Sequence, residues 1–182
     1  RHAGTLYPPG FIGRMGWHMG DLACLIGKGT AEAACRAADT AVAAAETVSD
    51  GTLAYALCRP PGHHASAEVA GGHCYLNNSA IAAERLRANG ARVAILDIDV
   101  HHGNGTQSIY YRNGNVTTVS VHAGAGMFYP WFTGHPDDRG EGEPLHFRAR
   151  WREWSRLAAG SGRWFGGGGG IGRRRAGARV GS

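Results

Sequence analysis

The residues best suited to chemistry in this sequence come at the end of a short apolar run. Residues 93–98 have the composition of a strand that is buried on both faces of a sheet. Asp97, Asp99 and His101 then follow at every second position, and the two-residue period of a strand places them on one face. Carboxylates and imidazoles bind divalent metals, and open α/β sheets bind ligands at the carboxyl ends of their parallel strands. The spacing therefore predicts a metal site.

A second group, the adjacent pair His63 and His64, follows Pro60-Pro61-Gly62. A lone aspartate after a strand is more often a capping or turn residue than a ligand, and a histidine pair after a turn could lie on a solvated loop. Together these residues supply what a metal-dependent hydrolase needs. Asp99 and His101 are the candidate ligands, and the histidine pair supplies the acid and the base. Asp97 and Asn104 could hold the imidazoles in one tautomer.

Other residues could shape a pocket around these groups. Gly72, Gly103 and Gly105 allow close approach of the backbone to a ligand. His73 and Tyr129 could form the walls of a narrow pocket. The aromatic run 127–132 that includes Tyr129 could equally be part of a core.

The elements that must position these residues can be read from the pattern of the chain. Residues 1–20 lack a sustained period and are expected to form a loop. A helix is expected from residue 30 to about residue 48, with Thr30 as N-cap and residues 49–51 as its end. A short strand is expected over residues 53–58, because two prolines follow it.

The second half of the pattern predicts a strand–helix–strand unit. A helix capped by Asn77 or Asn78 is expected to run to about residue 88, with Ile81 and Leu86 facing inward. It is followed by the strand over 93–98 and then by two further elements: a helical turn over 106–111 and a strand over 116–121. Such a unit is right-handed and parallel, so the loops that carry the two histidine groups emerge at the same edge of the sheet.

Composition limits the class of protein. The 182 residues suit one domain, 43% of them are hydrophobic, and no apolar run reaches the roughly 18 residues of a membrane span. Four cysteines without a Cys-x-x-Cys pair favour the cytoplasm. The net charge of +5 belongs to residues 147–182, which carry nine arginines against one glutamate, whereas residues 1–146 carry ten basic and thirteen acidic residues. Basic charge is thus a property of the tail.

Three long motifs give the chain a resemblance to a known family. They are, in order, Arg59-Pro60-Pro61-Gly62-His63-His64-Ala65, Gly71-Gly72-His73-Cys74-Tyr75-Leu76-Asn77-Asn78 and Asp97-Ile98-Asp99-Val100-His101-His102-Gly103-Asn104-Gly105-Thr106. They resemble the zinc-dependent histone deacetylase and acetylpolyamine amidohydrolase superfamily, and the segment 128–142 is closer to its bacterial acetylpolyamine amidohydrolase branch. The resemblance implies an α/β fold of the arginase and deacetylase type, with a parallel sheet flanked by helices. It implies removal of an acetyl group from a small acetylated amine or acetyl-lysine by metal-activated water.

The resemblance also implies a role for each matching residue. Asp99 and His101 match two zinc ligands, and His63 and His64 match a catalytic pair supported by Asp97 and Asn104. Gly72 matches a position whose carbonyl holds the substrate amide, and His73 and Tyr129 match the walls of the acyl-lysine channel. A structural potassium site is implied at Asp97, Asp99, His101, Ser120 and Val121.

Two residues that the family requires are missing. The third zinc ligand is an Asp well downstream and the transition-state Tyr comes later still, but this chain has no Asp after Asp138 and no Tyr after Tyr129. We therefore expect residues 1–146 to form a partial, incomplete catalytic domain. Residues 147–182 are expected to be a disordered, unrelated tail that arose from a shifted reading frame. The coding DNA tests this, because another frame beyond codon 145 should then encode the two missing segments.

Two alternatives to an active enzyme remain. The chain could be a catalytically incompetent fragment that associates through its unfinished sheet, as a homo-oligomer or otherwise. It could also bind nucleic acid through its arginine-rich tail, although this is the weaker reading because the basic residues follow no placed helix or strand.

Overall fold

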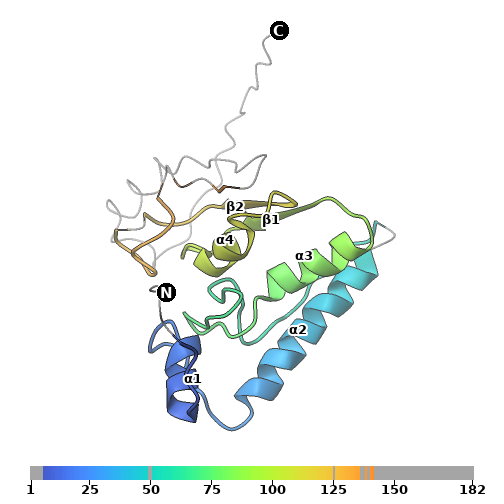
Figure 1. The fold of residues 1–182 in the computed structure, drawn as a ribbon. Helices are drawn as coiled ribbons and strands as arrows, with labels where there is room; N and C mark the ends of the chain where they lie inside the picture. Colours follow the sequence, from blue (N-terminus) through green and yellow to red (C-terminus); the bar gives the residue numbers. More distant parts are fainter. Residues whose placement is uncertain (1–5, 49–50, 125, 136–137, 139, 142–182) are drawn as a thin grey trace, which may run out of the picture.

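The computed structural model describes residues 6–48, 51–124, 126–135, 138 and 140–141. The expected tail over 147–182, its boundary at residue 146 and part of the helix end at 49–51 lie outside these residues. The described part contains six elements (Figure 1), namely α1 (Phe11–His18), α2 (Thr30–Thr47), α3 (Asn78–Ala88), β1 (Val93–Asp97), α4 (Asn104–Tyr110) and β2 (Val116–Ser120).

The predicted strand–helix–strand unit is confirmed. Strands β1 and β2 pair in parallel, in a register that runs from Val93 opposite Val116 to Asp97 opposite Ser120. Helix α4 connects them, as parallel neighbours require. Both strands therefore end at the same edge of the sheet, next to the polar loop that begins at Asp99.

A small core joins this unit to α3. Ala80, Ala83, Tyr110 and Val116 are buried together, and Val93, Ile95 and Ile109 pack against them. The Tyr110 hydroxyl donates hydrogen bonds to the Ala80 carbonyl, at 3.2 Å, and to Glu84, at 3.0 Å. These bonds satisfy the one polar group of a side chain that is otherwise fully buried.

Helix α2 lies along α3 (Figure 1), on the side away from α4. Its buried residues, Ala34, Ala37, Ala41 and Ala45, recur every three or four positions and so form one stripe of the helix. Such small side chains allow the axes of α2 and α3 to approach closely. Gly29 precedes the helix at a φ of +89°, so the prediction that Thr30 is the N-cap is wrong. Thr30 lies in the first turn, and its hydroxyl accepts a hydrogen bond from the Gly27 N–H.

The N-terminal region also differs from the prediction, because residues 11–18 form α1 rather than loop. This helix has no buried residue and no side-chain cap, so the sequence contains no apolar period or capping residue that would predict it. It is held at its end, where the backbone of His18 accepts from the Ala70 N–H and its ring bonds to the Glu68 carbonyl at 2.7 Å.

Two predictions about the sheet are wrong in the described part of the chain. Residues 53–58 are extended but are not assigned as a strand, because no described segment pairs with them. Strand β1 is not buried on both faces: Leu96 is 64% exposed, and Ile98 just beyond the strand is 77% exposed. Helix α3 covers the other face, with Asn78, Ala80 and Ala83 as its buried residues, whereas Ile81 and Leu86 are only half-buried. One layer of helices thus covers one face of the sheet.

Among the residues that the structure describes, no helix is both long enough and apolar enough to cross a membrane.

Candidate active site

The loop that carries His63 and His64 is fixed by backbone contacts to the start of α4. The His63 carbonyl accepts hydrogen bonds from the Gly105 and Thr106 N–H groups, at 3.0 and 3.1 Å. A Cβ on Gly105 would lie 2.3 Å from the Ala65 carbonyl oxygen, so only glycine permits this approach. On the other side, Asn77 donates to the Ala65 carbonyl at 2.9 Å. The loop that carries the histidine pair is therefore joined to α4 and, through Ala65, to the N-cap of α3.

Each histidine of the pair has its own acceptor. His63 Nδ1 lies 2.8 Å from Asp97 Oδ2, and His64 Nδ1 lies 2.7 Å from Asn104 Oδ1. A carboxylate can only accept, so Nδ1 of His63 donates and Nε2 is the basic nitrogen of the neutral ring. The two rings lie 3.9 Å apart. The structure thus brings together four residues that were predicted to act together from positions up to 41 residues apart.

The surroundings keep this group in defined charge states. Burial lowers the pKa of His64 to about 4, and the neighbouring His63 adds to the effect, so the His64 ring is neutral near pH 7. Burial acts to raise the pKa of Asp97. The hydrogen bond from His63, the charge of that ring when it is protonated, and the Asp99 N–H together outweigh that effect, so the pKa of Asp97 lies below its ordinary value. A neutral imidazole and an ionised carboxylate are the states that general-base chemistry requires.

Asp99 and His101 form a second pair beside the first. Asp99 Oδ1 accepts from the His101 backbone N–H at 2.7 Å and lies 3.0 Å from His101 Nδ1. Two ligand atoms on a tetrahedral zinc ion stand about 3.3 Å apart, so this pair fits two corners of such a site. The two side chains are 49% and 40% exposed. The described residues contain no group of three or more His, Cys, Asp or Glu that could hold a metal, so the pair fits zinc as half a site.

Gly72 and Tyr129 line the approach to the histidine pair. Gly72 has a φ of +52°, and a Cβ at this position would lie 2.2 Å from His64 Cδ2. The Tyr129 ring lies 4.6 Å from the His64 ring and 6.4 Å from the His101 ring. His73 is exposed, at a φ of 66°, and the ring contacts of the described residues join Tyr129, not His73, to the pair. The structure therefore places Tyr129, one of the two residues predicted to form walls, beside the histidine pair.

A carboxylate that the sequence did not single out holds this wall. Asp21 Oδ2 accepts from the Gly72 N–H, at 2.9 Å, and from the Tyr129 hydroxyl, while Oδ1 accepts from the Ala23 N–H at 2.8 Å. Partial burial acts to raise the pKa of Asp21, but these hydrogen bonds outweigh it and lower the pKa below its ordinary value. Asp21 lies in no motif, so its sequence context carried no signal of this role.

The loop that bears Tyr129 is also attached at its far end. His102 Nδ1 lies 3.0 Å from the Thr133 hydroxyl, and His122 Nε2 lies 3.0 Å from the Gly134 carbonyl oxygen. The two rings lie 4.5 Å apart, and a Cβ on Gly134 would approach both of them to 2.6 Å. His122 thus contacts the loop that bears Tyr129 rather than the histidine pair.

The residues predicted to bind potassium are engaged with other protein groups. The Ser120 hydroxyl lies 2.8 Å from His122 Nδ1, and the Asp97 carbonyl accepts from the Val121 N–H at 2.8 Å. Asp97 Oδ1 accepts from the Asp99 N–H. Nothing in these contacts supports a second metal, and potassium has no place in the function proposed below.

Comparison with known proteins identifies the family to which this fold and this set of contacts belong. Residues 10–155 match the histone deacetylase domain family, so the chain belongs to that family. This confirms the resemblance seen in the three motifs and the predicted α/β fold.

Among similar proteins are the acetylpolyamine amidohydrolase of Burkholderia pseudomallei, 51% identical over 139 residues, and acetylpolyamine amidohydrolase 1 of Pseudomonas aeruginosa, 44% identical over 158 residues. The matches cover 76% and 81% of this chain, but 41% and 46% of the relatives. The chain therefore spans less than half the length of these relatives.

Solved structures of related proteins show the same fold. The crystal structure of acetylpolyamine aminohydrolase from Burkholderia pseudomallei matches with a TM-score of 0.70 at 48% identity, over 75% of this chain and 42% of that one. An HDAC homolog from Aquifex aeolicus matches with a TM-score of 0.62 at 30% identity, over 68% and 33%. These relatives support the bacterial acetylpolyamine amidohydrolase branch that the segment 128–142 indicated.

Proposed function

We propose that this chain is part of a zinc-dependent amidohydrolase that removes the acetyl group from an acetylated amine. The observation that carries the proposal is the placement of two oriented imidazoles, His63 and His64, beside the pair Asp99 and His101. The names of the similar bacterial proteins favour an acetylated polyamine over acetyl-lysine.

Each of these residues would have its own role in the hydrolysis. Zinc held by Asp99 and His101 would supply a Lewis acid for the acetamide carbonyl and for an attacking water. His63, as primary base, takes a proton from the water at Nε2, and Asp97 stabilises the resulting imidazolium through Nδ1. His64 assists and is oriented by Asn104. The water oxygen bonds to the carbonyl carbon, the carbon–nitrogen bond breaks, and the amine leaves with the proton that His63 took from the water. The acetic acid formed loses its proton to solvent, so the products are acetate and a free amine.

Other residues would bind the acetylated end of the substrate. Tyr129 and His73 would form the walls of the channel, and the Gly72 carbonyl would hold the substrate amide. Asp21 would fix two of these three groups, since it accepts hydrogen bonds from both Gly72 and Tyr129.

The 182 residues contain no match for two groups that the family resemblance implies, the third zinc ligand and the transition-state Tyr. Two protein ligands leave zinc one short of the three found in catalytic sites. Without a downstream Tyr, the developing oxyanion loses a donor worth about 3 kcal/mol. We therefore expect weak or no turnover from this polypeptide, with residues 1–146 as a partial domain and residues 147–182 as an unrelated tail. A cytoplasmic location also stays a prediction.

One experiment tests the enzyme against the incompetent fragment. The full chain is purified with zinc, its metal content is measured, and acetate release is assayed with acetylated polyamines and acetyl-lysine. A His63→Ala variant should abolish any turnover, whereas His135→Ala, at an exposed histidine, should not change it. Stoichiometric zinc with turnover that depends on His63 supports the enzyme. Absence of both supports the fragment.

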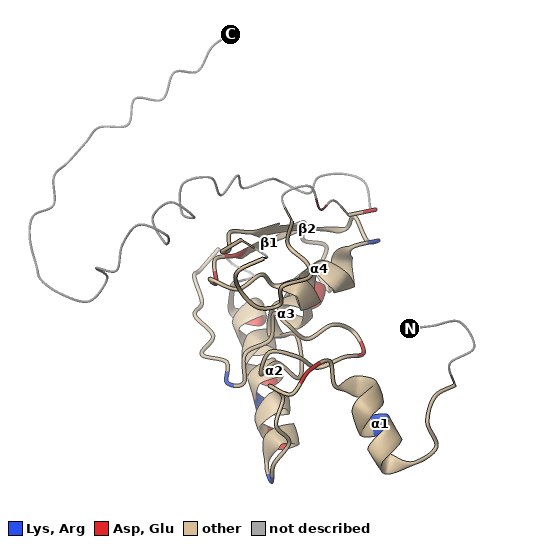
Figure 2. Cartoon of the chain, turned by 90° about the vertical axis from the view of Figure 1, so that its left-hand side faces the viewer, with Lys and Arg blue, Asp and Glu red and all other residues tan. Residues whose placement is uncertain are grey.

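Nucleic-acid binding is the weaker alternative. The Lys and Arg residues of the described part are scattered over several elements (Figure 2), and Arg85, Arg87 and Arg112 are paired with glutamates. Binding would have to come from the tail. Nucleic-acid binding that survives deletion of residues 147–182 would exclude that route.

A further inference from the structure

Trp131 combines a backbone conformation and an exposure that are unusual for a large aromatic residue. Its φ is +64°, in the left-handed region that residues with a Cβ rarely adopt. The side chain is 60% exposed, so burial in a core does not explain a tryptophan at this position. The turn around it is held in place, because the Trp131 N–H donates to the Phe128 carbonyl at 3.0 Å and Pro130 is fully buried. Residues held in such conformations cluster at functional sites.

The Trp131 ring continues the wall that Tyr129 forms beside the histidine pair. The rings of Trp131 and Tyr129 lie 5.2 Å apart in an edge-to-face arrangement, and the Tyr129 ring lies 4.6 Å from the His64 ring. In the part of the chain that the structure describes, ring contacts join Trp131, and not its exposed neighbour Phe132, to Tyr129. Trp131 is exposed whereas Tyr129 is half-buried, so Trp131 lies at the solvent end of this wall.

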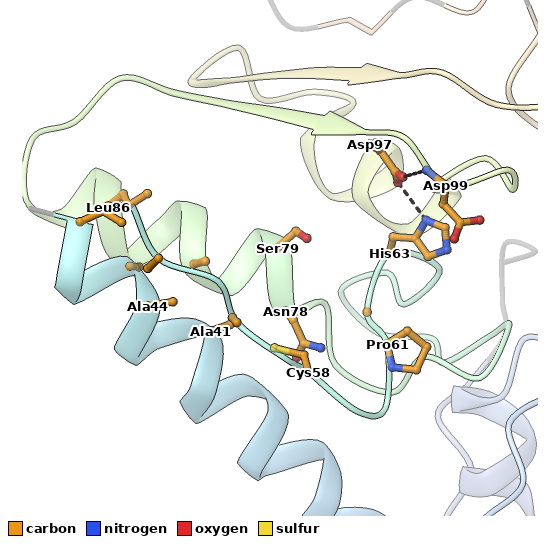
Figure 3. Close-up of a pocket in the computed structure, with 16 residues that line it drawn as sticks. Ala41, Ala44, Cys58, Pro61, His63, Asn78, Ser79, Leu86, Asp97 and Asp99 are labelled. Atoms are coloured by element: carbon orange, nitrogen blue, oxygen red, sulfur yellow. Dashed lines mark hydrogen bonds and ion pairs between the residues drawn. The ribbon is translucent and has the colours of Figure 1, made fainter. Parts of the chain in front are cut away.

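The fixed charges around this wall are negative. Asp21 is partly exposed and accepts the hydrogen bond of the Tyr129 hydroxyl. Figure 3 shows Asp97 and Asp99 beside the His63 ring, to which Asp97 is hydrogen-bonded. Lys and Arg do not occur in the segments of the sequence that carry these groups, namely residues 15–27, 60–84, 93–111 and 113–135. The charges of these segments therefore favour a cationic ligand over an anionic one.

We propose that Trp131 is a specificity-determining residue that binds the ammonium group of the substrate against the face of its indole ring. The face of a Trp ring attracts cations more strongly than that of Tyr or Phe. In an acetylated polyamine, several methylene groups separate the acetamide from the next ammonium group. With the acetamide at the histidine pair, the ammonium group extends past Tyr129 toward Trp131, on the wall that Asp21 also holds. The inference rests on the proposed function, because it takes an acetylated amine as the substrate.

The Trp131 contact would separate two classes of acetylated substrate. An acetylated polyamine presents an ammonium group beyond its acetamide, whereas an acetyl-lysine side chain within a peptide presents methylene groups and an uncharged backbone. Contact with the ring face therefore favours the polyamine. If Trp131 acted only as an apolar surface, it would favour neither of these substrates.

The test measures binding and requires neither zinc nor turnover. The full 182-residue chain is titrated with N-acetylputrescine and with two neutral probes in a calorimeter. One neutral probe is N-pentylacetamide, in which a methyl group replaces the ammonium group, and the other is acetyl-lysine blocked at its α-amine and its carboxyl group. N-acetylputrescine should bind at least about threefold more tightly than either neutral probe. An inactive chain can still show this preference, so failure of the inference is distinct from failure of the proposed function.

Two matched variants assign the preference to the ring. Trp131→Leu keeps an apolar side chain but removes the ring, and should reduce the preference for N-acetylputrescine about threefold to fivefold while leaving the neutral probes unchanged. Phe132→Leu makes the same kind of change at a neighbouring side chain that is 69% exposed, and should change none of the three affinities. Circular dichroism checks the fold of both. If Trp131→Leu unfolds, Trp131→Gly replaces it, because glycine adopts a positive φ without strain.

Three results would overturn the proposal. One is that the folded chain fails to bind N-acetylputrescine, or binds it no more tightly than the neutral probes. Another is that the chain without the Trp131 ring keeps its full preference, which would make the carboxylates its whole source. The third is an equal loss of preference in Phe132→Leu, which would make the effect one of the loop and not of Trp131.

Discussion

The hydroxyl of Tyr129 donates a hydrogen bond to the carboxylate of Asp21, 108 residues earlier in the chain. The same oxygen of Asp21 accepts from the backbone of Gly72. One carboxylate therefore fixes two groups that face the His64 ring, one of them a side chain and the other a peptide.

Replacing Asp21 by alanine should free both groups. Three hydrogen bonds to one partly exposed carboxylate are lost, and we expect the free energy of unfolding to fall by about 1–2 kcal/mol. Urea denaturation measures the change. Asp39→Ala, at an exposed position of α2, is the control and should change stability by less than about 0.5 kcal/mol. Equal losses in the two variants would show that Asp21 does not hold this wall.

The contribution of Asp21 should also depend on pH in a defined direction. Its pKa in the folded chain lies below the ordinary value of 3.8, so the folded state binds this proton less readily than the unfolded state does. The stabilisation is therefore fully present above about pH 5 and is lost as pH falls through the lowered pKa. Unfolding curves recorded from about pH 6 to pH 3 should show a steeper loss for the natural chain than for Asp21→Asn. Parallel curves would contradict the assignment.

Gly72→Ala should be far more damaging than a substitution at another glycine with positive φ. The added Cβ meets His64 Cδ2 at 2.2 Å and Tyr129 Cε1 at 2.9 Å, so the candidate site itself must shift. We expect a loss of about 3 kcal/mol or more in the free energy of unfolding. Gly90 has a φ of +84° and nothing within 4 Å of an added Cβ, so Gly90→Ala isolates the backbone cost, about 1 kcal/mol. Thermal unfolding of both variants makes the comparison, and a similar loss in each would mean that His64 and Tyr129 can move aside.

The open face of the sheet layer should make the isolated chain self-associate. Leu96→Lys places a charge on that face and should reduce binding of a hydrophobic dye and light scattering. Because Leu96 is 64% exposed, the free energy of unfolding should change by less than about 0.5 kcal/mol. Ile12→Lys, on α1, removes an apolar side chain elsewhere that is 85% exposed, more than Leu96. If it reduces dye binding as much as Leu96→Lys does, the open face is not the cause.

The parts of this molecule that could be predicted are those that depend on neighbours in sequence. The strand, turn and strand from Val93 to Ser120 follow from local apolar runs, and the partners of His63 and His64 followed once the sheet edge was placed. Helix α1 was missed because it buries nothing and has no cap.

Contacts between residues far apart in the sequence could not be predicted either. Asp21 reaches Tyr129 and Gly72 across the fold, and no local period marks such a residue. Residues 53–58 have the composition of a strand, but a strand exists only where a partner supplies hydrogen bonds, and composition does not show whether the partner is there.

The unpaired segment 53–58 also determines how the chain would be degraded. In the part of the chain that the structure describes, the amides of this segment make no backbone hydrogen bonds, and Leu53 and Tyr55 are each more than four-fifths exposed. Such a segment is accessible to a protease without unfolding of the core. Cleavage there would separate α1 and α2 from the part that carries the histidine pair. The lifetime of this polypeptide in a cell would then be governed by the rate of cleavage in this segment, rather than by the stability of its core.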